Sequence, residues 1–241
     1  RSSPVQIGSL TDWKGVTADQ LAEGYPTRLS VSSYGAHIIK DDGTLWGWGW
    51  GGQSQGGWGD TSDRSSPVQI GSGTDWNSIS QSVDYNVLAS KTDGTLWAWG
   101  KNNVGQLGDG STVDRNSPVQ VGSLTTWKYV STGYEHSHAV KTDGTLWAMG
   151  RNNVGQLGVG NTTNYSSPVQ VGSLTTWEQS NDNYESSRFL HTDGTFWAVG
   201  LNNNGNLGDG TTTNRSSPVQ IGTTTTWSKL WGGKEATIIL R

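Results

Sequence analysis

Short segments in which apolar and polar side chains alternate recur along the chain and predict β-strands. In the copy of the pattern that begins at Trp127, the segments cover residues 127–131, 137–141, 145–150 and 168–171. The pair Asp143-Gly144 between the second and third segments supplies the positive φ angles of a tight antiparallel hairpin. Gly, Thr, Asn and Trp are poor helix formers, and no apolar stripe at a spacing of about 3.6 residues is present. Each copy therefore predicts four antiparallel strands.

The pattern returns about every 50 residues, a period typical of propeller and solenoid repeats. A Ser-Pro-Val-Gln segment recurs with its proline at Pro4, Pro67, Pro118, Pro168 and Pro218, and a tryptophan stands nine residues after each proline. A second block, Asp-Gly-Thr followed by Leu or Phe, ends at Trp46, Trp97, Trp147 and Trp197. We therefore expect an all-β protein: a β-propeller of four-stranded antiparallel blades, with four complete blades and part of a fifth.

The repeats indicate one domain, with repeat boundaries near 13–70, 76–121, 127–171, 177–221 and 227–241. Proline cannot donate to a sheet ladder, so the strand that starts at Pro168 should be the outer edge strand, and the small-residue strand 137–141 should lie innermost. The chain starts and stops inside a repeat, which indicates a piece of a longer polypeptide. Blade edges left open would invite pairing with another copy.

Three blocks of one repeat carry a family resemblance. Gly133–Val140 reads Gly-Tyr-Glu-His-Ser-His-Ala-Val, Asp143–Gly150 reads Asp-Gly-Thr-Leu-Trp-Ala-Met-Gly, and Gly155–Gly158 reads Gly-Gln-Leu-Gly. Together they resemble the repeat of the regulator of chromosome condensation family, and the resemblance covers the whole chain. It implies a β-propeller, closest in style to bacterial and phage surface-protein members. The family's repeat histidine stands only at His136, and the other copies have Gly35, Asn86, Ser186 and Ala236.

The internal copies separate into a constant scaffold and variable windows. Residues 92–103 and 142–153 differ at only two positions, where Trp99 and Lys101 correspond to Met149 and Arg151. The copies diverge between each repeat's first tryptophan and the next strand. Because these windows occupy equivalent positions in successive blades, a ring would gather them at one end, as in a recognition surface. Drift of solvent-exposed loops is the alternative explanation.

The window after Trp13 is enlarged, and Thr17–Gln20 has the spacing of a helix capping box. Tyrosines and tryptophans, which give large contact areas at low entropic cost, occur in the windows and in a glycine-rich loop of the first repeat. The predicted partner-binding residues are Tyr34, His37, Trp48, Trp50, Trp58, Asp84, Tyr85, Tyr129, Tyr134, Glu135, His136, Tyr184, Glu185 and Trp231. Nine of the 14 tryptophans sit at fixed repeat positions and should fill the space between blades.

The amino-acid composition argues against several classes of protein function. The net charge is −4, and the 16 basic residues form no run, which argues against nucleic acid as a partner. Without cysteine there is no disulfide and no thiolate metal site. No segment approaches the roughly 20 consecutive apolar residues of a membrane-spanning helix, so we expect no membrane insertion.

Catalytic and cofactor motifs are scarce. The four histidines and the serines lack the context of a nucleophile elbow, and the glycine-rich stretches lack the Lys-Ser or Lys-Thr of a phosphate loop. A carboxylate pair drawn from Asp84, Glu135 and Glu185 is the remaining enzyme hypothesis. His136 and His138 face one side of a strand, and a metal site would need a third ligand from Glu135 or a neighbouring blade, so hydrogen-bonding histidines are the favoured interpretation. We expect no enzyme, no cofactor and no metal.

These observations favour a non-catalytic recognition or adhesion module that binds a protein or a cell-surface glycan through variable loops on one propeller face. The low charge and near-identical repeats suggest an extracellular or virion-surface protein such as a phage tail fibre. One alternative is a structural subunit that self-associates through open blade edges into a filament. Another is a protein-binding regulator or inhibitor, of the GTPase-exchange type or the enzyme-inhibitor type.

Overall fold

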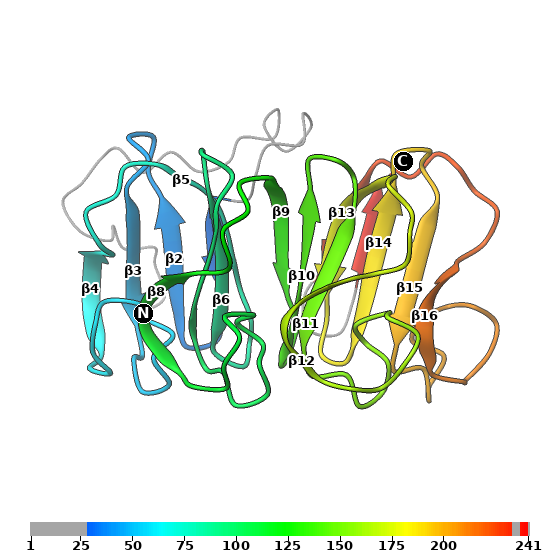
Figure 1. Ribbon diagram of the computed structural model, residues 1–241, viewed down its shortest axis with the longest axis horizontal. Helices are drawn as coiled ribbons and strands as arrows, with labels where there is room; N and C mark the ends of the chain where they lie inside the picture. Colours follow the sequence, from blue (N-terminus) through cyan, green and yellow to red (C-terminus); the bar gives the residue numbers. More distant parts are fainter. Residues whose placement is uncertain (1–27, 233–236, 241) are drawn as a thin grey trace, which may run out of the picture.

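The computed structural model describes residues 28–232 and 237–240, so the predicted capping box at Thr17–Gln20 lies outside the described residues. Four antiparallel sheets of four strands follow one another along the long axis of the molecule (Figure 1). The first two sheets contain β1 (Leu29–Val31), β2 (Gly35–Ile39), β3 (Leu45–Gly49), β4 (Arg64–Gln69), β5 (Trp76–Gln81), β6 (Asn86–Lys91), β7 (Leu96–Gly100) and β8 (Arg115–Gln120).

The next two sheets contain β9 (Trp127–Thr132), β10 (His136–Lys141), β11 (Leu146–Gly150), β12 (Tyr165–Gln170), β13 (Trp177–Asp182), β14 (Ser186–His191), β15 (Phe196–Gly200) and β16 (Arg215–Gln220). A two-stranded sheet of β17 (Lys229–Gly232) and β18 (Thr237–Leu240) follows. The prediction of an all-β fold built from four-stranded antiparallel blades is confirmed. Among the described residues, no helix is long and apolar enough to span a membrane.

The Asp-Gly-Thr block forms the hairpin between the second and third strands. In the third sheet, Asp143 Oδ1 accepts hydrogen bonds from the Thr145 backbone N–H at 3.0 Å and from its hydroxyl at 2.7 Å. The Thr145 hydroxyl in turn accepts from the indole N–H of Trp147 at 2.9 Å. The other three complete sheets repeat the arrangement. One short motif therefore sets the turn and fixes a tryptophan ring in every blade.

The first strand of each sheet is the innermost one. The order β9-β10-β11-β12 places the proline strand β12 at the outer edge, as predicted, but it places β10 second rather than innermost. The prediction for the small-residue strand 137–141 is therefore wrong. Successive first strands meet through their hydroxyl side chains: Ser80 Oγ lies 2.9 Å from Thr132 Oγ1, and Ser131 Oγ lies 2.8 Å from Ser180 Oγ. These non-local contacts, which no local pattern reveals, decide which edge faces inward.

Apolar side chains fill the space between neighbouring sheets. Leu88 and Leu96 of the second sheet, and Leu107 of the loop between β7 and β8, pack with Trp127 and Met149 of the third sheet in one buried cluster. The Lys141 ammonium lies 4.9 Å from the ring centroid of Trp127 and 3.7 Å from that of Trp147, where a cation adds electrostatic attraction to the apolar packing. The fixed tryptophans thus contribute to the cores between sheets.

A hydrogen-bond relay also joins neighbouring sheets. Asn86 Nδ2 donates to Ser137 Oγ at 3.1 Å, and the Ser137 hydroxyl donates to the Gln106 carbonyl at 2.9 Å. One sheet further on, His136 Nε2 lies 2.9 Å from Ser187 Oγ, whose hydroxyl donates to the Gln156 carbonyl. Asn86 and His136 therefore act alike, which explains why the family's histidine can be replaced by another polar side chain.

Candidate functional site

Two sets of loops lie at one end of the sheets. In each complete sheet, the turn after the first strand accepts a backbone hydrogen bond from the residue that follows the third strand. The pairs are Trp50 N to Tyr34 O, Lys101 N to Tyr85 O, Arg151 N to Glu135 O and Leu201 N to Glu185 O, at 2.8–3.1 Å. We call these eight residues, together with Asp84, Tyr134 and Tyr184, the loop face. The fixed backbone holds its side chains in regular order while their chemistry changes from sheet to sheet.

Three aromatic rings form a cluster at the start of the loop face. Ring centroids are 5.4 Å apart for Tyr34 and Trp50, 5.0 Å for Tyr34 and Tyr85, and 5.1 Å for Trp50 and Tyr85. Tyr34 remains 44% exposed. Tyr85 has a φ of 72°, which a bulky residue adopts only when its surroundings impose it. A hydrogen bond with the Tyr34 hydroxyl raises the pKa of Tyr85 to about 12, so Tyr85 stays protonated within a pre-arranged cluster.

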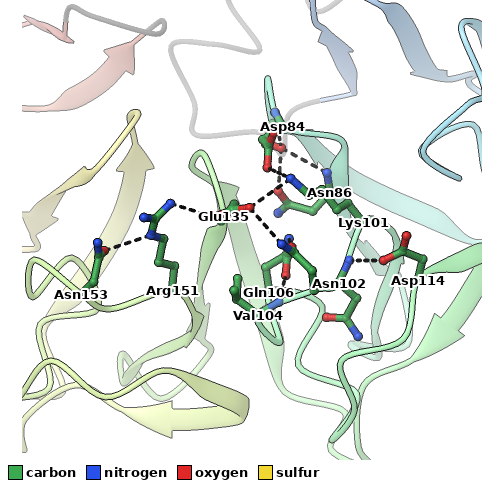
Figure 2. Close-up of polar contacts among 12 residues, drawn as sticks. Asp84, Asn86, Lys101, Asn102, Val104, Gln106, Asp114, Glu135, Arg151 and Asn153 are labelled. Atoms are coloured by element: carbon green, nitrogen blue, oxygen red, sulfur yellow. Dashed lines mark hydrogen bonds and ion pairs between the residues drawn. The ribbon is translucent and has the colours of Figure 1, made fainter.

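Four charged side chains lie next to the aromatic cluster. Lys101 Nζ is 2.7 Å from Asp84 Oδ2 in its own sheet and 3.0 Å from Glu135 Oε1 in the next. Glu135 Oε2 also accepts from Arg151 Nη1 at 2.9 Å. Figure 2 shows Glu135 between Lys101 and Arg151. Both carboxylates are buried and both cations are partly exposed, so the network fixes the orientation of two cationic groups at the surface.

The carboxyl groups of this network differ in their titration. Burial and the neighbouring Glu135 charge raise the pKa of Asp84, and Lys101 only partly opposes this shift. Burial would also raise the pKa of Glu135, but hydrogen bonds and charges from Lys101, Asn103 and Arg151 outweigh it and hold that pKa below its usual value. Asp84 and Glu135 together raise the pKa of Lys101 although burial opposes them. Glu135 is therefore the firmly ionised centre of the network.

Replacement of Glu135 by glutamine should lower the free energy of unfolding by about 1.5–3 kcal/mol near neutral pH, because charge-assisted hydrogen bonds from three donors are weakened. The lowered pKa means that the Glu135 contribution is present above the ordinary value of 4.5 and is lost as the pH falls through the lowered pKa. Urea unfolding of both proteins at about pH 7 and about pH 3.5 measures this difference.

Glu178→Gln is the control for this prediction, because no cation pairs with Glu178 among the described residues. It should change stability by less than about 0.5 kcal/mol at both pH values. A difference between wild type and Glu135→Gln that does not shrink in acid would contradict the assigned charge network.

A pair of tyrosines and two cavities complete the loop face. The Tyr134 and Tyr184 ring centroids are 4.2 Å apart, and their hydrogen bond raises the pKa of Tyr134. Both rings border a cavity of about 390 Å³ that lies between the innermost strands, where Tyr129 also contributes. Tyr184, Glu185 and Arg188 line a second cavity of about 540 Å³. The loop face thus combines exposed rings with concave, polar surroundings.

Several residues predicted as partner-binding lie elsewhere. His37 and His136 are buried, with exposures of 2% and 0%, and both are hydrogen-bonded inside the structure. Burial lowers the pKa of His37, and it lowers that of His136 to about 4. Trp48 is half-buried on β3, and Trp58 folds onto its own loop, where its indole N–H donates to the Ser62 carbonyl at 3.0 Å. The side chain of Trp231 lies outside the described residues.

Lys101 and Arg151 belong to the loop face but were absent from the predicted site. The two residues occupy the same position of the repeat, and that position is one of only two at which the otherwise identical scaffold segments 92–103 and 142–153 differ. A signal was therefore present: the position after the third strand reads Trp50, Lys101, Arg151 and Leu201 in successive repeats, as variable as the windows themselves.

Four-stranded antiparallel sheets whose first strands surround a common cavity define a repeat protein of the β-propeller type. The chain belongs to the regulator of chromosome condensation (RCC1) repeat family. One model of this repeat matches residues 93–140, 143–179 and 193–240, and a second matches residues 78–106 and 127–156. The family resemblance inferred from the sequence is thereby confirmed.

The matches to known proteins cover only part of each relative's length. The ultraviolet-B receptor UVR8 of Arabidopsis thaliana is 31% identical over 108 residues, which are 44% of this chain and 24% of the receptor. Human WBSCR16 matches with a TM-score of 0.79 and 19% identity over 89% of this chain and 57% of its own. Saccharomyces cerevisiae Prp20p, described with its binding to Gsp1p and histones, matches with a TM-score of 0.76 and 18% identity over 93% and 54%. The chain spans about half the length of these two structures, which show the fold alone.

These relatives agree with one of the alternatives better than with the favoured interpretation. A receptor and a protein that binds Gsp1p and histones fit the protein-binding regulator. They give no support to adhesion or a phage tail fibre, and a glycan partner and self-association stay predictions. The extracellular or virion-surface location also stays a prediction.

Proposed function

We propose that this chain is a non-catalytic protein-binding regulatory module and that the loop face is its binding surface. The observation that carries this proposal is the cluster of Tyr34, Trp50 and Tyr85 beside the ion pairs of Lys101 and Arg151. Tyrosine, tryptophan and arginine are the residue types that dominate binding energy at protein interfaces. Here they come from three successive blades and form one continuous surface.

Pre-organisation supports the proposal. Each loop-face turn is tied to its neighbouring loop by a backbone hydrogen bond, and each cation already has a carboxylate partner. Binding then requires little further ordering of long side chains, which would otherwise weaken association. The loop face carries three carboxylates, Asp84, Glu135 and Glu185, against the two cations Lys101 and Arg151. Its net charge is therefore small and negative, and a protein partner fits better than a polyanion.

Matched surface variants test the placement of the site. Tyr34→Ala and Tyr184→Ala remove rings that are 44% and 39% exposed on the loop face. Leu124→Ala and Leu174→Ala remove side chains that are 47% and 44% exposed in the loops between blades, at the opposite, hairpin end of the sheets. The immobilised wild-type domain is used to capture proteins from a lysate of the source organism, and the affinity of each captured protein is then measured with every variant.

We expect each loop-face variant to weaken binding at least tenfold and the hairpin-end variants to leave it unchanged, since loss of an anchor residue removes about 1.4 kcal/mol or more. Partners lost with the leucine variants but kept with the tyrosine variants would refute this placement. A glycan array and light scattering over a concentration series decide between a protein partner and the glycan or self-association hypotheses.

A further inference from the structure

A second polar cluster lies inside the molecule, at the contact between the third and fourth sheets. His136 and His138 project from β10 to the same side, and Asp182 ends β13 of the next sheet. His138 Nδ1 is 2.9 Å from Asp182 Oδ1, and His136 Nε2 is 3.9 Å from the same oxygen. One ligand atom from each residue lies within 4.8 Å of the others. The three side chains therefore surround one small volume.

The equivalent contacts between the other sheets provide an internal comparison. His37 occupies the position of His138 in the first sheet, and its Nδ1 lies 2.8 Å from Oε1 of Gln81, the counterpart of Asp182. An amide oxygen therefore satisfies this histidine without burying a charge. Between the second and third sheets the corresponding residues are Asn86, Leu88 and Thr132. Only the contact between the third and fourth sheets, among those described, combines two imidazoles with a carboxylate.

A buried carboxylate requires a compensating positive charge. His138 Nε2 lies 3.3 Å from the Leu157 carbonyl, to which it can donate its proton. His138 Nδ1 and Asp182 Oδ1, both acceptors in that tautomer, then face each other at 2.9 Å. Two acceptor atoms at this distance need a cation between them, either a proton or a metal ion. His136 Nε2 is the third atom around the same volume; it contacts the Ser187 hydroxyl at 2.9 Å, and a metal ion would take the place of that contact.

The surrounding groups match those that orient metal ligands in proteins. Metal-binding histidines commonly donate their second ring N–H to a carbonyl, and ligating carboxylates are themselves hydrogen-bonded. Here the Leu157 carbonyl faces His138 Nε2, and the Ser131 hydroxyl donates to Asp182 Oδ2 at 2.8 Å. His136 Nδ1 has no hydrogen-bond partner among the described residues, so the ring proton can move to Nδ1 and leave Nε2, which now contacts the Ser187 hydroxyl, free to bind a metal ion. Ser131 and Asp182 also line the 390 Å³ cavity, which provides an entry path.

We propose that His136, His138 and Asp182 bind one divalent transition-metal ion that reaches them from this cavity. Two imidazole nitrogens and one carboxylate oxygen are a donor set of zinc-type sites, whose metal–ligand distances of about 2.0–2.2 Å require only small side-chain shifts here. The ion replaces the proton between His138 and Asp182, and water or the Ser187 hydroxyl completes its coordination. The ion thereby joins the third sheet to the fourth, beside the cavity that Tyr134 and Tyr184 also line.

Cobalt and zinc are the probes for this site, with the whole chain prepared without a histidine tag. Addition of Co²⁺ to the metal-free protein should produce the visible absorption of a four- or five-coordinate site and saturate at one equivalent. Zn²⁺ should displace the cobalt and raise the melting temperature. Asp182→Asn should weaken both metals at least 100-fold, while the asparagine keeps a hydrogen bond to His138, as Gln81 does to His37.

His37→Gln is the matched control, because it removes a buried histidine that has no carboxylate partner. It should leave metal affinity and stoichiometry unchanged. Circular dichroism verifies that each variant is folded, and His136→Asn offers a second ligand variant, since Asn86 fills that position in the second sheet. Failure of the wild type to bind either metal, or equal binding by wild type and Asp182→Asn, would overturn the proposal. Neither result would affect the tyrosine test of the loop face.

Discussion

Replacement of Trp99 by alanine is expected to lower the free energy of unfolding by about 3–5 kcal/mol, the usual loss for a large buried ring. Trp99 is fully buried, and its indole N–H donates to the Gln55 carbonyl of the preceding blade at 3.0 Å. Its ring lies 6.0 Å from that of Trp76 and 5.7 Å from that of His37. Alanine would leave a cavity and an unpaired carbonyl between two sheets. Urea unfolding followed by circular dichroism measures the loss.

Met149 supplies the control, because it occupies the position of Trp99 in an almost identical segment of the third sheet. Trp99→Met should destabilise clearly less than Trp99→Ala, since the flexible thioether refills part of the space. An alanine variant within about 1 kcal/mol of wild type would contradict the view that this ring holds the first and second sheets together.

Much of the fold is predictable because its determinants are local. The Asp143-Gly144 turn, the Thr145 hydroxyl and the Trp147 indole form one hydrogen-bonded chain within five residues. The missing N–H of Pro168 likewise restricts its strand to a sheet edge. Such signals recur in every repeat, so the number of strands per blade and the outer strand follow from the sequence alone.

The inner edge of the blades depends on contacts between distant residues. Ser131 and Ser180 are about 50 residues apart, and their hydroxyl contact exists only once two blades are side by side. Small side chains on β10 suggested close packing at the centre, but β10 is covered on both sides by β9 and β11. A local pattern identifies a strand without showing which neighbours cover it.

In the candidate site, too, local sequence predicts some residue positions, whereas others depend on contacts between blades. Window tyrosines such as Tyr34 and Tyr184 lie on the loop face because turns between strands stay exposed. His37 was misplaced because strand alternation turns it inward toward Gln81 of the next sheet. Lys101 was assigned to the scaffold because its segment is nearly invariant, although its ammonium group reaches across to Glu135 of the following blade. Asp182, likewise, meets His138 only through the packing of two sheets.

Gly144→Ala should destabilise the protein by about 3–5 kcal/mol, and Gly172→Ala by only about 1–2 kcal/mol. Both glycines have positive φ angles, 77° and 60°, so the backbone strain of an alanine is similar at the two positions. A Cβ at Gly144 would lie 2.1 Å from the Thr175 carbonyl oxygen, whereas a Cβ at Gly172 meets nothing within 4 Å. The Gly144 carbonyl also accepts from the Trp177 N–H at 3.0 Å, so the clash would pull the hairpin away from the first strand of the next blade. Urea unfolding of the two variants isolates this contact between blades, and equal losses would show that backbone strain alone explains why glycine is needed in the Asp-Gly turn.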